Sequence, residues 1–403
     1  MKTVVITGIG MINGVGNNAK ESFQAILEAK GGVDYISYYD TKDHAVQIAS
    51  EVKNFDPLDV MKAKDIKKFD RYIHLGICSA KEALNDANID DTIDNNRFGV
   101  VGATGYGGIA TLQNDITNTV LYNKKISPYS LPGTLTSMLA GYTSIHFNLK
   151  GPNISSTTAC AAGLHAIIQG SKTIMTDGAD VMLIVGSESP ITPLSLGAFH
   201  AMKALSTRND DPKSASRPFD KDRDGFVMGE GSASLVLETL EHAQKRGAKI
   251  YATINGFGES ADASHFAFPT VDGPVRALEA SLKMANYPQI DYINAHGTST
   301  PIGDINETKA LKEIFNDKVP PISSVKGSIG HCLGAAGIME TVISIMALNQ
   351  NIIPPTINLI NPDPECDLDY VPNIARKQTL NTVLTTSYGF GGTNASMILQ
   401  KYE

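Results

Sequence analysis

Three segments of the N-terminal half of this chain return, in the same order, in the C-terminal half. The pairs are 3–10 (TVVITGIG) with 252–258 (ATINGFG), 98–105 (FGVVGATG) with 292–298 (YINAHGT), and 153–156 (NISS) with 321–324 (PISS). The first two pairs each predict a strand followed by a glycine turn, and the third predicts a short extended run. Internal similarity in a constant order is typical of a repeated architecture. We therefore expect two related halves.

Helical segments are expected between these units. Residues 70–87 and 272–285 are predicted to be helical, and alternating strands and helices predict central sheets covered by helices. A predicted helix at 238–246, followed by a turn at 247–249, places a boundary near residue 250. The expected halves are residues 1–250 and residues 251–403. They should share one interface and one active site.

The composition supports a folded α/β enzyme and excludes some classes of function. The 403 residues are 42% apolar and include 36 glycines and 19 prolines, which fits a globular chain with many tight turns. The formal net charge of −8 argues against a nucleic-acid-binding surface, because such a surface needs a net basic face. Any basic docking patch must therefore be local.

The cysteines and the N-terminus bear on the cellular compartment. The four cysteines, which have neither CxxC nor metal-ligand spacing, are Cys78, Cys160, Cys332 and Cys366. Their scarcity suits a reducing compartment, and no zinc site is expected. The first ten residues are too short and too glycine-broken for a signal peptide, and no apolar run is expected to approach membrane-spanning length. We expect a cytoplasmic protein without membrane insertion.

Cys160 stands at a predicted junction between a strand and a helix. Residues 154–157 are expected to be extended, and residues 164–175 carry the apolar spacing of a buried helix. N–H groups and the dipole at a helix N-terminus favour the nucleophilic thiolate, so we expect them to lower the pKa of Cys160 from about 8.5. An unpaired intracellular cysteine is more often a small buried apolar residue, so position alone leaves both roles open.

Two distant histidines favour the catalytic role. His296 follows the predicted strand 290–293, and His331 precedes the glycine-rich segment 333–337. Both lie in glycine-flanked turns, where catalytic groups collect because a rigid sheet positions them while the turn exposes them. Each histidine alone is more often structural. Their combination with Cys160 is what indicates a nucleophilic enzyme.

Several motifs spread over almost the whole chain carry a family resemblance. They are 156–163 (STTACAAG), 205–210 (LSTRND), 216–220 (SRPFD) with 224–227 (DGFV), 294–301 (NAHGTSTP), 330–331 (GH) with 334–337 (GAAG), 354–358 (PPTIN) and 389–394 (GFGGTN). In this order they resemble the β-ketoacyl-acyl carrier protein synthases, most closely the type II elongating enzymes of fatty acid synthesis.

This resemblance implies a fold, a reaction and partners. The fold would be α/β and thiolase-like, with five layers (αβαβα) and two duplicated halves that contain mixed sheets. The reaction would be a decarboxylative Claisen condensation, in which an acyl group on Cys160 reacts with malonyl-acyl carrier protein. The partners would be acyl carrier protein with its phosphopantetheine arm and a second copy of the chain. The reaction requires no redox or metal cofactor.

The resemblance also assigns roles to single residues. The backbone N–H groups of Cys160 and Phe390 are expected to bind the tetrahedral oxyanion, and the Phe390 ring to gate the acyl chamber. His296 and His331 are expected to stabilise the malonyl-derived enolate as neutral donors. Residues expected to contact the substrate or its phosphopantetheine arm are Thr298, Thr300, Tyr106, Phe199, Ser130 and Gly391.

Charged and polar positions have implied roles as well. Lys326 and Glu340 are expected to form a supporting charge pair near His331. Lysines that align with the family's carrier-docking positions are Lys64, Lys67, Lys68 and Lys203. Without the resemblance, a lysine cluster of this kind is usually a solvated helix face. Residues that match a monovalent cation site of some relatives, but that could equally be internal hydrogen-bonding groups, are Asn294, Glu340 and Ser387.

The chain departs from the long-chain enzymes at three places. Tyr106 stands where a smaller aliphatic residue usually lines the acyl pocket, and Ser130 stands where a bulky aromatic residue often reaches across the dimer interface. The turn 12–16 (INGVG) lacks the common proline. These departures leave open a ketosynthase of a specialised polyketide or aryl polyene pathway, as the alternative to ordinary fatty acid elongation.

Other members of the wider family are less compatible with the sequence. A thiolase would carry a second catalytic cysteine in the loop 389–394, which contains none. The initiating synthases use a Cys-His-Asn arrangement, whereas this chain offers Cys-His-His. A non-catalytic subunit of the chain-length-factor type generally lacks the nucleophile, and Cys160 argues against it.

Overall fold

The computed structural model describes residues 2–90 and 92–402, and its main feature is a ten-stranded sheet built from two matching sets of five strands. The first set is β1 (Val4–Asn13), β4 (Phe98–Ala103), β5 (Asn153–Ser156), β6 (Val181–Glu188) and β7 (Gly231–Thr239). The second set is β8 (Ala252–Ala261), β9 (Tyr292–Asn294), β10 (Ile322–Ser323), β13 (Thr382–Gly389) and β14 (Thr393–Lys401). The strand order is β10-β9-β13-β14-β8-β1-β7-β6-β4-β5.

The two sets repeat the same pattern of pairing. From the centre outward, each set has two antiparallel pairings followed by two parallel ones. The sets meet only where Val5 pairs with Thr253 and Ile6 with Ala252. The expected pair of mixed sheets is therefore present, joined through one short antiparallel contact.

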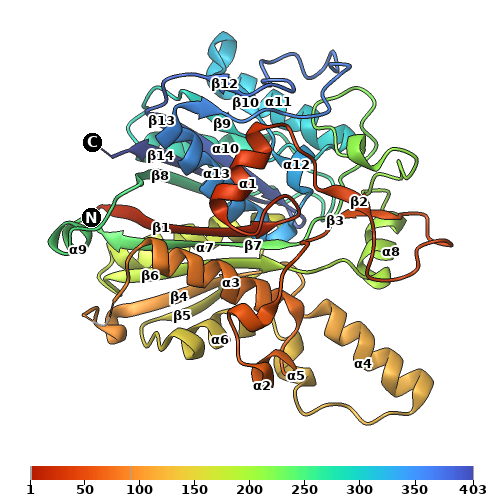
Figure 1. Ribbon diagram of the computed structural model, residues 1–403. Coiled ribbons are helices and arrows are strands. Elements are labelled where there is room, and N and C mark those ends of the chain that lie inside the picture. The colour runs from red at the N-terminus through yellow and green to blue at the C-terminus, as the bar shows by residue number, and fades with distance from the viewer. Residues whose placement is uncertain (1, 91, 403) are drawn as a thin grey trace.

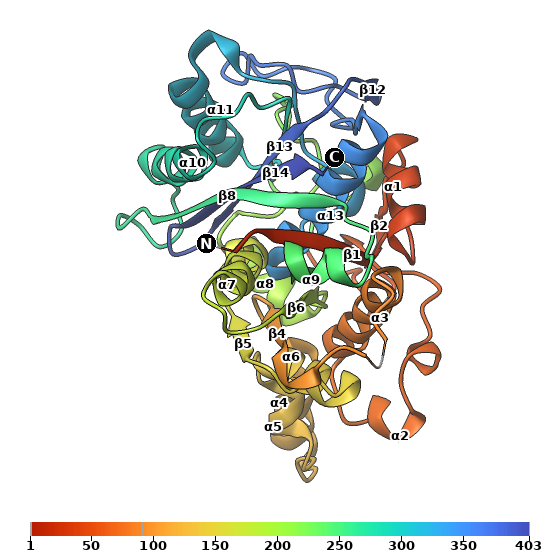
Figure 2. The same cartoon turned by 90° about the vertical axis from the view of Figure 1, so that its left-hand side faces the viewer.

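Helices cover both outer faces and fill the space between the two sets of strands (Figures 1 and 2). The outer helices are α3 (Arg71–Asp86) and α6 (Met138–Phe147) on the first set, and α10 (Asp272–Met284) and α11 (Pro301–Phe315) on the second. The central helices are α7 (Ala162–Met175) and α13 (Ala336–Gln350), which contact each other and both sets. This arrangement confirms the expected five-layered αβαβα fold.

Shorter elements connect these layers. The remaining helices are α1 (Ala19–Leu27), α2 (Ala63–Ile66), α4 (Ile109–Tyr122), α5 (Ser130–Thr134), α8 (Pro193–Ala201), α9 (Leu240–Lys245) and α12 (Lys326–Ile329). The remaining strands form two small sheets, β2 (Val33–Tyr35) with β3 (Ile48–Ser50) and β11 (Ile352–Ile353) with β12 (Arg376–Lys377). Two single-turn 3₁₀ helices precede the central helices, η3 (Ala159–Ala161) before α7 and η6 (Leu333–Ala335) before α13.

The glycines of the first repeated pair do not form the predicted turns. Both β1 and β8 continue through them, because a helix packs directly on the strand at these points. A Cβ at Gly10 would lie 2.1 Å from the carbonyl oxygen of Ser79 on α3. A Cβ at Gly258 would lie 1.9 Å from that of Ala277 on α10. The glycines therefore permit close helix–strand contact in both halves.

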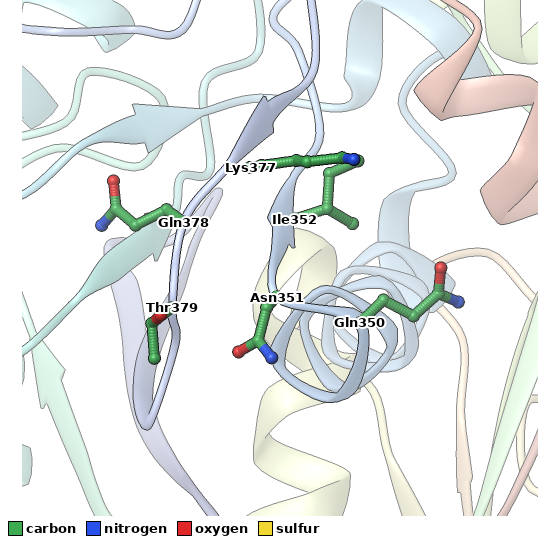
Figure 3. A pocket seen from close by; sticks show the side chains of 6 residues that line it. All are labelled: Gln350, Asn351, Ile352, Lys377, Gln378 and Thr379. Carbon is green, nitrogen blue, oxygen red and sulfur yellow. The ribbon is translucent and has the colours of Figure 1, made fainter.

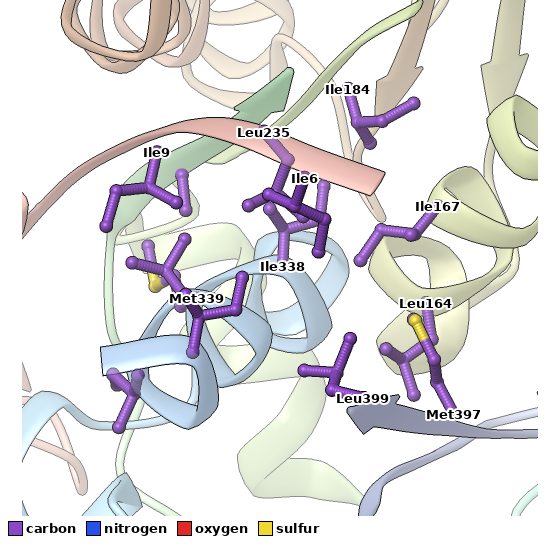
Figure 4. Close-up of a cluster of buried hydrophobic side chains, with 14 of the residues drawn as sticks. Ile6, Ile9, Leu164, Ile167, Ile184, Leu235, Ile338, Met339, Met397 and Leu399 are labelled. Carbon is purple, nitrogen blue, oxygen red and sulfur yellow. The ribbon is translucent and has the colours of Figure 1, made fainter. Parts of the chain in front are cut away.

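The central helices cross at a pair of glycines. A Cβ at Gly163 of α7 would lie 2.8 Å from the backbone nitrogen of Ile338, and a Cβ at Gly337 of α13 would lie 2.8 Å from that of Leu164. Figure 4 shows apolar side chains around this crossing, among them Leu164, Ile167, Ile338 and Met339. The reciprocal contact relates the two halves by an approximate twofold symmetry.

Two predictions about helices need correction. The helix predicted at 238–246 begins at Leu240, because Glu238 and Thr239 belong to β7. The buried carboxylate of Glu238 accepts a hydrogen bond of 2.8 Å from Arg246. The prediction that no apolar run approaches membrane-spanning length was wrong for Leu333–Gln350, which reaches that length and composition. Within the fold, 89% of that segment is buried, as is typical of a helix covered on all sides by a protein core.

Candidate active site

Cys160 lies in a tight elbow between β5 and α7. The residue before it, Ala159, has a φ of 48°, a left-handed conformation that costs energy for a residue with a side chain. The side chain of Thr158 shares a hydrogen bond of 2.6 Å with Nδ1 of His165 on α7. The carbonyl of Thr158 accepts one of 3.2 Å from Thr393 Oγ1. These contacts hold the elbow, and Cys160 lines a cavity.

The predicted lowering of the Cys160 pKa was wrong for the unliganded protein. Burial raises the pKa of the thiol to about 12, and the charges of Glu188 and Glu340 act in the same direction. The Lys326 charge and the backbone N–H of Cys160 lower it, as expected for a helix start, but they do not compensate for the loss of solvation. The resting cysteine is therefore a thiol.

His296 lies on the loop after β9, and buried polar groups hold its backbone. Its N–H donates to Glu307 Oε1 at 2.9 Å and to Thr386 Oγ1 at 3.0 Å. The N–H of Gly297 donates to the other Glu307 oxygen at 2.7 Å. The Glu307 carboxylate on α11 thus fixes the turn that presents the imidazole.

His331 follows α12, and its backbone pairs with the segment 227–229. Its N–H donates to the carbonyl of Val227 at 2.8 Å, and its carbonyl accepts from the N–H of Gly229 at 3.0 Å. Its ring packs edge-on against Phe226, with a centroid distance of 5.2 Å. The rings of His296 and His331 are 5.5 Å apart and nearly perpendicular, at 86°. Two residues that are remote in sequence therefore present their imidazoles together.

Both imidazoles are neutral. Burial lowers the pKa of each well below its ordinary value, and the Lys326 charge acts in the same direction. Among the described residues, neither ring nitrogen of His331 has a hydrogen-bond partner, nor does Nδ1 of His296. Neutral, unpartnered imidazoles inside a cavity are available to bind a substrate group.

Lys326 connects the backbone of His296 to a buried carboxylate. Its ammonium group forms an ion pair with Glu340 of α13 and donates a hydrogen bond of 2.5 Å to the carbonyl of His296. Both side chains are about 1% exposed. Lys326 and Glu340 therefore form the expected charge pair, and Lys326 also contacts the backbone of His296.

Cys160, His296 and His331 open into one cavity of about 600 Å³. Other predicted site residues that line this cavity are Phe199, Lys203, Thr298, Thr300 and Phe390. The hydroxyl groups of Thr298 and Thr300 are 3.1 Å apart. The ring of Phe390 lies 5.9 Å from that of Phe199. The cavity therefore has an apolar side and a side with hydroxyl groups.

Three predicted contact residues lie outside the cavity lining. Tyr106 lies behind Phe199, edge-on to its ring at a centroid distance of 6.0 Å. Gly391 has a φ of 85° and donates its N–H to the carbonyl of Phe266 at 2.7 Å, in the neighbouring loop. Ser130 lies on α5 and hydrogen bonds to Asp115 of α4, away from the cavity.

The predicted docking lysines lie in two separate places. Lys64 and Lys67 are exposed on and beside α2. Lys68 forms an ion pair of 2.7 Å with Asp65 and lies over the ring of Tyr129. Lys203 follows α8 at the edge of the cavity, and Figures 1 and 2 place α8 apart from α2. Within one chain, these lysines do not form a single patch.

The residues predicted near a cation, Asn294, Glu340 and Ser387, are all buried. In the part of the chain that the structure describes, no hydrogen-bond partner reaches the side-chain atoms of Asn294, Oε2 of Glu340 or Oγ of Ser387. No group of three or more histidine, cysteine or acidic side chains in the described ranges could hold a metal ion.

Sequence reasoning missed two buried carboxylates at this site. Glu307 supports the His296 turn, and Glu188, at the end of β6, accepts hydrogen bonds from three backbone N–H groups and one hydroxyl. The local sequence does not distinguish Glu307 from any other acidic residue on a helix. Nor does it distinguish Glu188 from any other residue at the end of a strand. Their roles depend on backbone groups from distant segments, which no local pattern shows.

A second hollow, of about 580 Å³, lies at the C-terminal end of α13 beside β11 and β12 (Figure 3). Its six lining residues are Gln350, Asn351, Ile352, Lys377, Gln378 and Thr379. They include neither a cysteine nor a histidine, and the hollow is open to solvent. Of these two cavities, the one at Cys160 brings cysteine and histidine side chains together.

Comparison with known proteins identifies relatives of this architecture. The chain matches the family models of the beta-ketoacyl synthase N-terminal domain over residues 1–243 and C-terminal domain over residues 251–360. A 3-oxoacyl-[acyl-carrier-protein] synthase 2 of Coxiella burnetii is 46% identical over 99% of both chains. A beta-ketoacyl synthase from Burkholderia phymatum has a TM-score of 0.93 at 32% identity, with all of both chains covered. A type II polyketide ketosynthase, solved with its acyl-carrier protein, has a TM-score of 0.91 at 31% identity and equal coverage.

Proposed function

Because this chain belongs to the β-ketoacyl synthase family, we propose that it is a β-ketoacyl-acyl carrier protein synthase of fatty acid elongation. It would condense an acyl thioester with malonyl-acyl carrier protein to give β-ketoacyl-acyl carrier protein and carbon dioxide. The observation that carries this proposal is the meeting of Cys160, His296 and His331 in one cavity.

In the first step, Cys160 accepts the acyl group. Its sulfur attacks the thioester carbonyl, and the thiol proton ends on the departing phosphopantetheine sulfur. The tetrahedral oxyanion would bind the backbone N–H groups of Cys160 and Phe390. One such donor typically contributes about 3 kcal/mol of transition-state stabilisation. The raised pKa of Cys160 is compatible with this step, because the proton is needed on the leaving group.

In the second step, the malonyl thioester loses carbon dioxide. The electrons of the broken carbon–carbon bond pass into an enolate, whose oxygen would accept hydrogen bonds from His296 and His331. The lowered pKa of each histidine keeps its imidazole neutral. A neutral imidazole suits this role, because its N–H can donate a hydrogen bond to the enolate oxygen without protonating the enolate carbon. Lys326 would act on this step through the His296 carbonyl and through its charge.

In the third step, the enolate carbon attacks the acyl carbonyl on Cys160. A second tetrahedral oxyanion forms and would bind the same backbone N–H groups. Collapse of this intermediate releases the Cys160 thiolate. A solvent proton restores the thiol. Thr298 and Thr300, at the polar side of the cavity, would hydrogen bond to the phosphopantetheine arm.

Carrier-protein docking would use the exposed lysines. Carrier protein is acidic, so Lys64, Lys67 and Lys203 would attract it although the chain as a whole is acidic. Lys68 would contribute less, because Asp65 already pairs with it. This docking is expected to weaken with added salt.

A monovalent cation at Asn294, Glu340 and Ser387 also remains a proposal. No described residue hydrogen bonds to Oδ1 of Asn294, Oε2 of Glu340 or Oγ of Ser387. Oxygen ligands suit a hard cation, whereas thiolate and imidazole ligands suit softer metals. Such an ion would stabilise the negative charge of Glu340 beside Lys326.

We propose a homodimer and a cytoplasmic location. β5 is the last strand of the sheet, and α4 exposes an apolar stripe of Leu112, Ile116 and Val120, the last of which is 74% exposed. A second copy would cover this face. Ser130 hydrogen bonds to Asp115 of α4 and so lies on the same face, where it would reach the partner's acyl pocket.

The specialised-pathway alternative is supported by the bulk of Tyr106 beside Phe199 and by the similarity to a type II polyketide ketosynthase. The relative named 3-oxoacyl-[acyl-carrier-protein] synthase 2 is the more similar one in sequence, and it favours elongation. The presence of Cys160 in the cavity disfavours a non-catalytic subunit.

Intact mass measurement after incubation with acyl-acyl carrier protein tests the proposal. The wild-type chain is expected to gain one acyl group, and Cys160→Ala to gain none. Cys332→Ala is the matched control and should gain the group, because Cys332 is fully buried. His331→Ala should still be acylated but form no β-ketoacyl product from malonyl-acyl carrier protein. A wild-type chain that gains no acyl group contradicts the proposal.

A further inference from the structure

The elbow that carries Cys160 has a counterpart in the C-terminal half. η3 begins at Ala159, with φ 48°, and η6 begins at Leu333, with φ 42°. The next residue is Cys160 in one elbow and Gly334 in the other. Each elbow continues into a central helix, α7 or α13. The backbone N–H of Gly334 therefore corresponds to that of Cys160.

The N–H of Gly334 donates to a carboxylate of the protein itself. It bonds Oε2 of Glu188 at 2.9 Å, and the N–H of Gly105 bonds the same oxygen at 2.6 Å. Oε1 accepts from Thr104 Oγ1 at 2.6 Å and from the N–H of Tyr106 at 3.2 Å. Glu188 is fully buried, and none of its described partners is cationic.

These donors tie the turn after β4 to the loop after His331. The turn carries Tyr106, which packs in the apolar cluster that includes Phe199, Leu333 and Cys160. The ring centroid of Phe199 lies 5.2 Å from that of Phe226 and 5.9 Å from that of Phe390. The wall behind the reactive sulfur thus depends on where Tyr106 is held.

We propose that Glu188 is a positioning residue for acyl-chain selection. Its carboxylate binds the N–H of the C-terminal elbow and those of the turn after β4, and it thereby holds Tyr106 behind Phe199, which lines the cavity. The inference rests on the proposed function, because it presumes that an acyl group occupies Cys160.

The hydrogen bonds to Glu188 predict what Glu188→Gln removes. Each carboxylate oxygen accepts two donors. An amide nitrogen accepts none, so at least two of the four donors lose their acceptor whichever way the amide turns. The turn that carries Tyr106 then lacks an anchor, and the wall relaxes. Thr104→Val is a milder change: it keeps the carboxylate and removes one donor to it, together with the acceptor of the Gly107 N–H.

The experiment is a competition for Cys160 between hexanoyl- and myristoyl-acyl carrier protein in one mixture. The ratio of the two acyl adducts is read by intact mass, and it does not depend on the fraction of active protein. Glu188→Gln should change the ratio by about fivefold or more, in the same direction as Tyr106→Ile. The double variant should match Tyr106→Ile within about twofold, because Glu188 acts through Tyr106.

Each outcome bears on the inference. An unchanged ratio in Glu188→Gln, or a double variant in which the two effects multiply, overturns it. If Glu188→Gln shows no cooperative thermal unfolding, Thr104→Val decides: a shift of about twofold in the same direction supports the inference, and no shift overturns it. Absence of any adduct on the wild-type chain counts first against the proposed function, whereas adducts with unchanged ratios count against the inference alone.

Discussion

The elbow of the N-terminal half presents a cysteine to an open cavity, whereas the elbow of the C-terminal half presents a glycine to a buried carboxylate. The two backbones are alike, down to the left-handed residue that starts each one. They differ in what their N–H groups face. In one elbow, the N–H of Cys160 is proposed to bind the charge that develops on a substrate. In the other, the N–H of Gly334 already donates to the Glu188 carboxylate of the protein itself.

This difference explains how a duplicated fold acquires a single active site. Backbone N–H groups at the start of a buried helix bind negative charge wherever it comes from. A side chain that supplies the charge makes the elbow structural, and a cavity that admits a substrate makes it catalytic. The C-terminal half instead contributes the histidines, on the loops that follow β9 and α12.

The largest expected effect tests the contacts that support the site residues of each half. The N-terminal elbow depends on neutral contacts such as Thr158 with His165, whereas the C-terminal half depends on the buried pair Lys326–Glu340. Lys326→Met leaves Glu340 buried without its partner and should reduce the free energy of unfolding by about 3–5 kcal/mol in urea denaturation. Lys326→Met/Glu340→Met is the control and should recover most of this loss. A single variant as stable as the wild type would show that the comparison is wrong.

A smaller effect is expected from giving the second elbow a side chain. A Cβ at Gly334 would lie 2.4 Å from the nitrogen of Gly105 and 2.5 Å from the carbonyl carbon of Thr104. Gly334→Ala should therefore reduce the free energy of unfolding by about 1–3 kcal/mol. Gly197→Ala on α8 is the matched control, because that Cβ meets nothing within 4 Å, and it should not destabilise. Equal unfolding free energies for the two variants would contradict this account.

The smallest effect concerns the reactivity of Cys160 itself. With a pKa of about 12, the thiolate is a minor species at neutral pH, and its fraction rises as pH approaches the pKa. Alkylation of Cys160 by iodoacetamide should accelerate by about tenfold per pH unit from pH 7 to 9. Cys332 is the internal control and should stay unmodified in the native protein, because it is fully buried. A rate that levels off below pH 8 would instead indicate a lowered pKa.

Residues whose chemistry depends on local context could be predicted from the sequence. Cys160 at a strand–helix junction, and His296 and His331 in glycine turns, lie where the motifs place them, and the repeated segments correctly predict the duplicated layers. The continuation of β1 and β8 through their glycines could not be predicted, because its cause is a helix that packs on each strand. The Cys160 pKa was mispredicted for a similar reason, since burial depends on segments far away in the chain.

The crossing of α7 and α13 constrains how such a chain can change. At Gly163 and Gly337, each helix leaves the other no room for even a methyl group. A substitution on one helix must be accommodated by displacement of the other, and the two helices carry the elbows of the separate halves. Exchange of a half between related proteins is therefore expected to preserve the geometry only when both members of this glycine pair are retained.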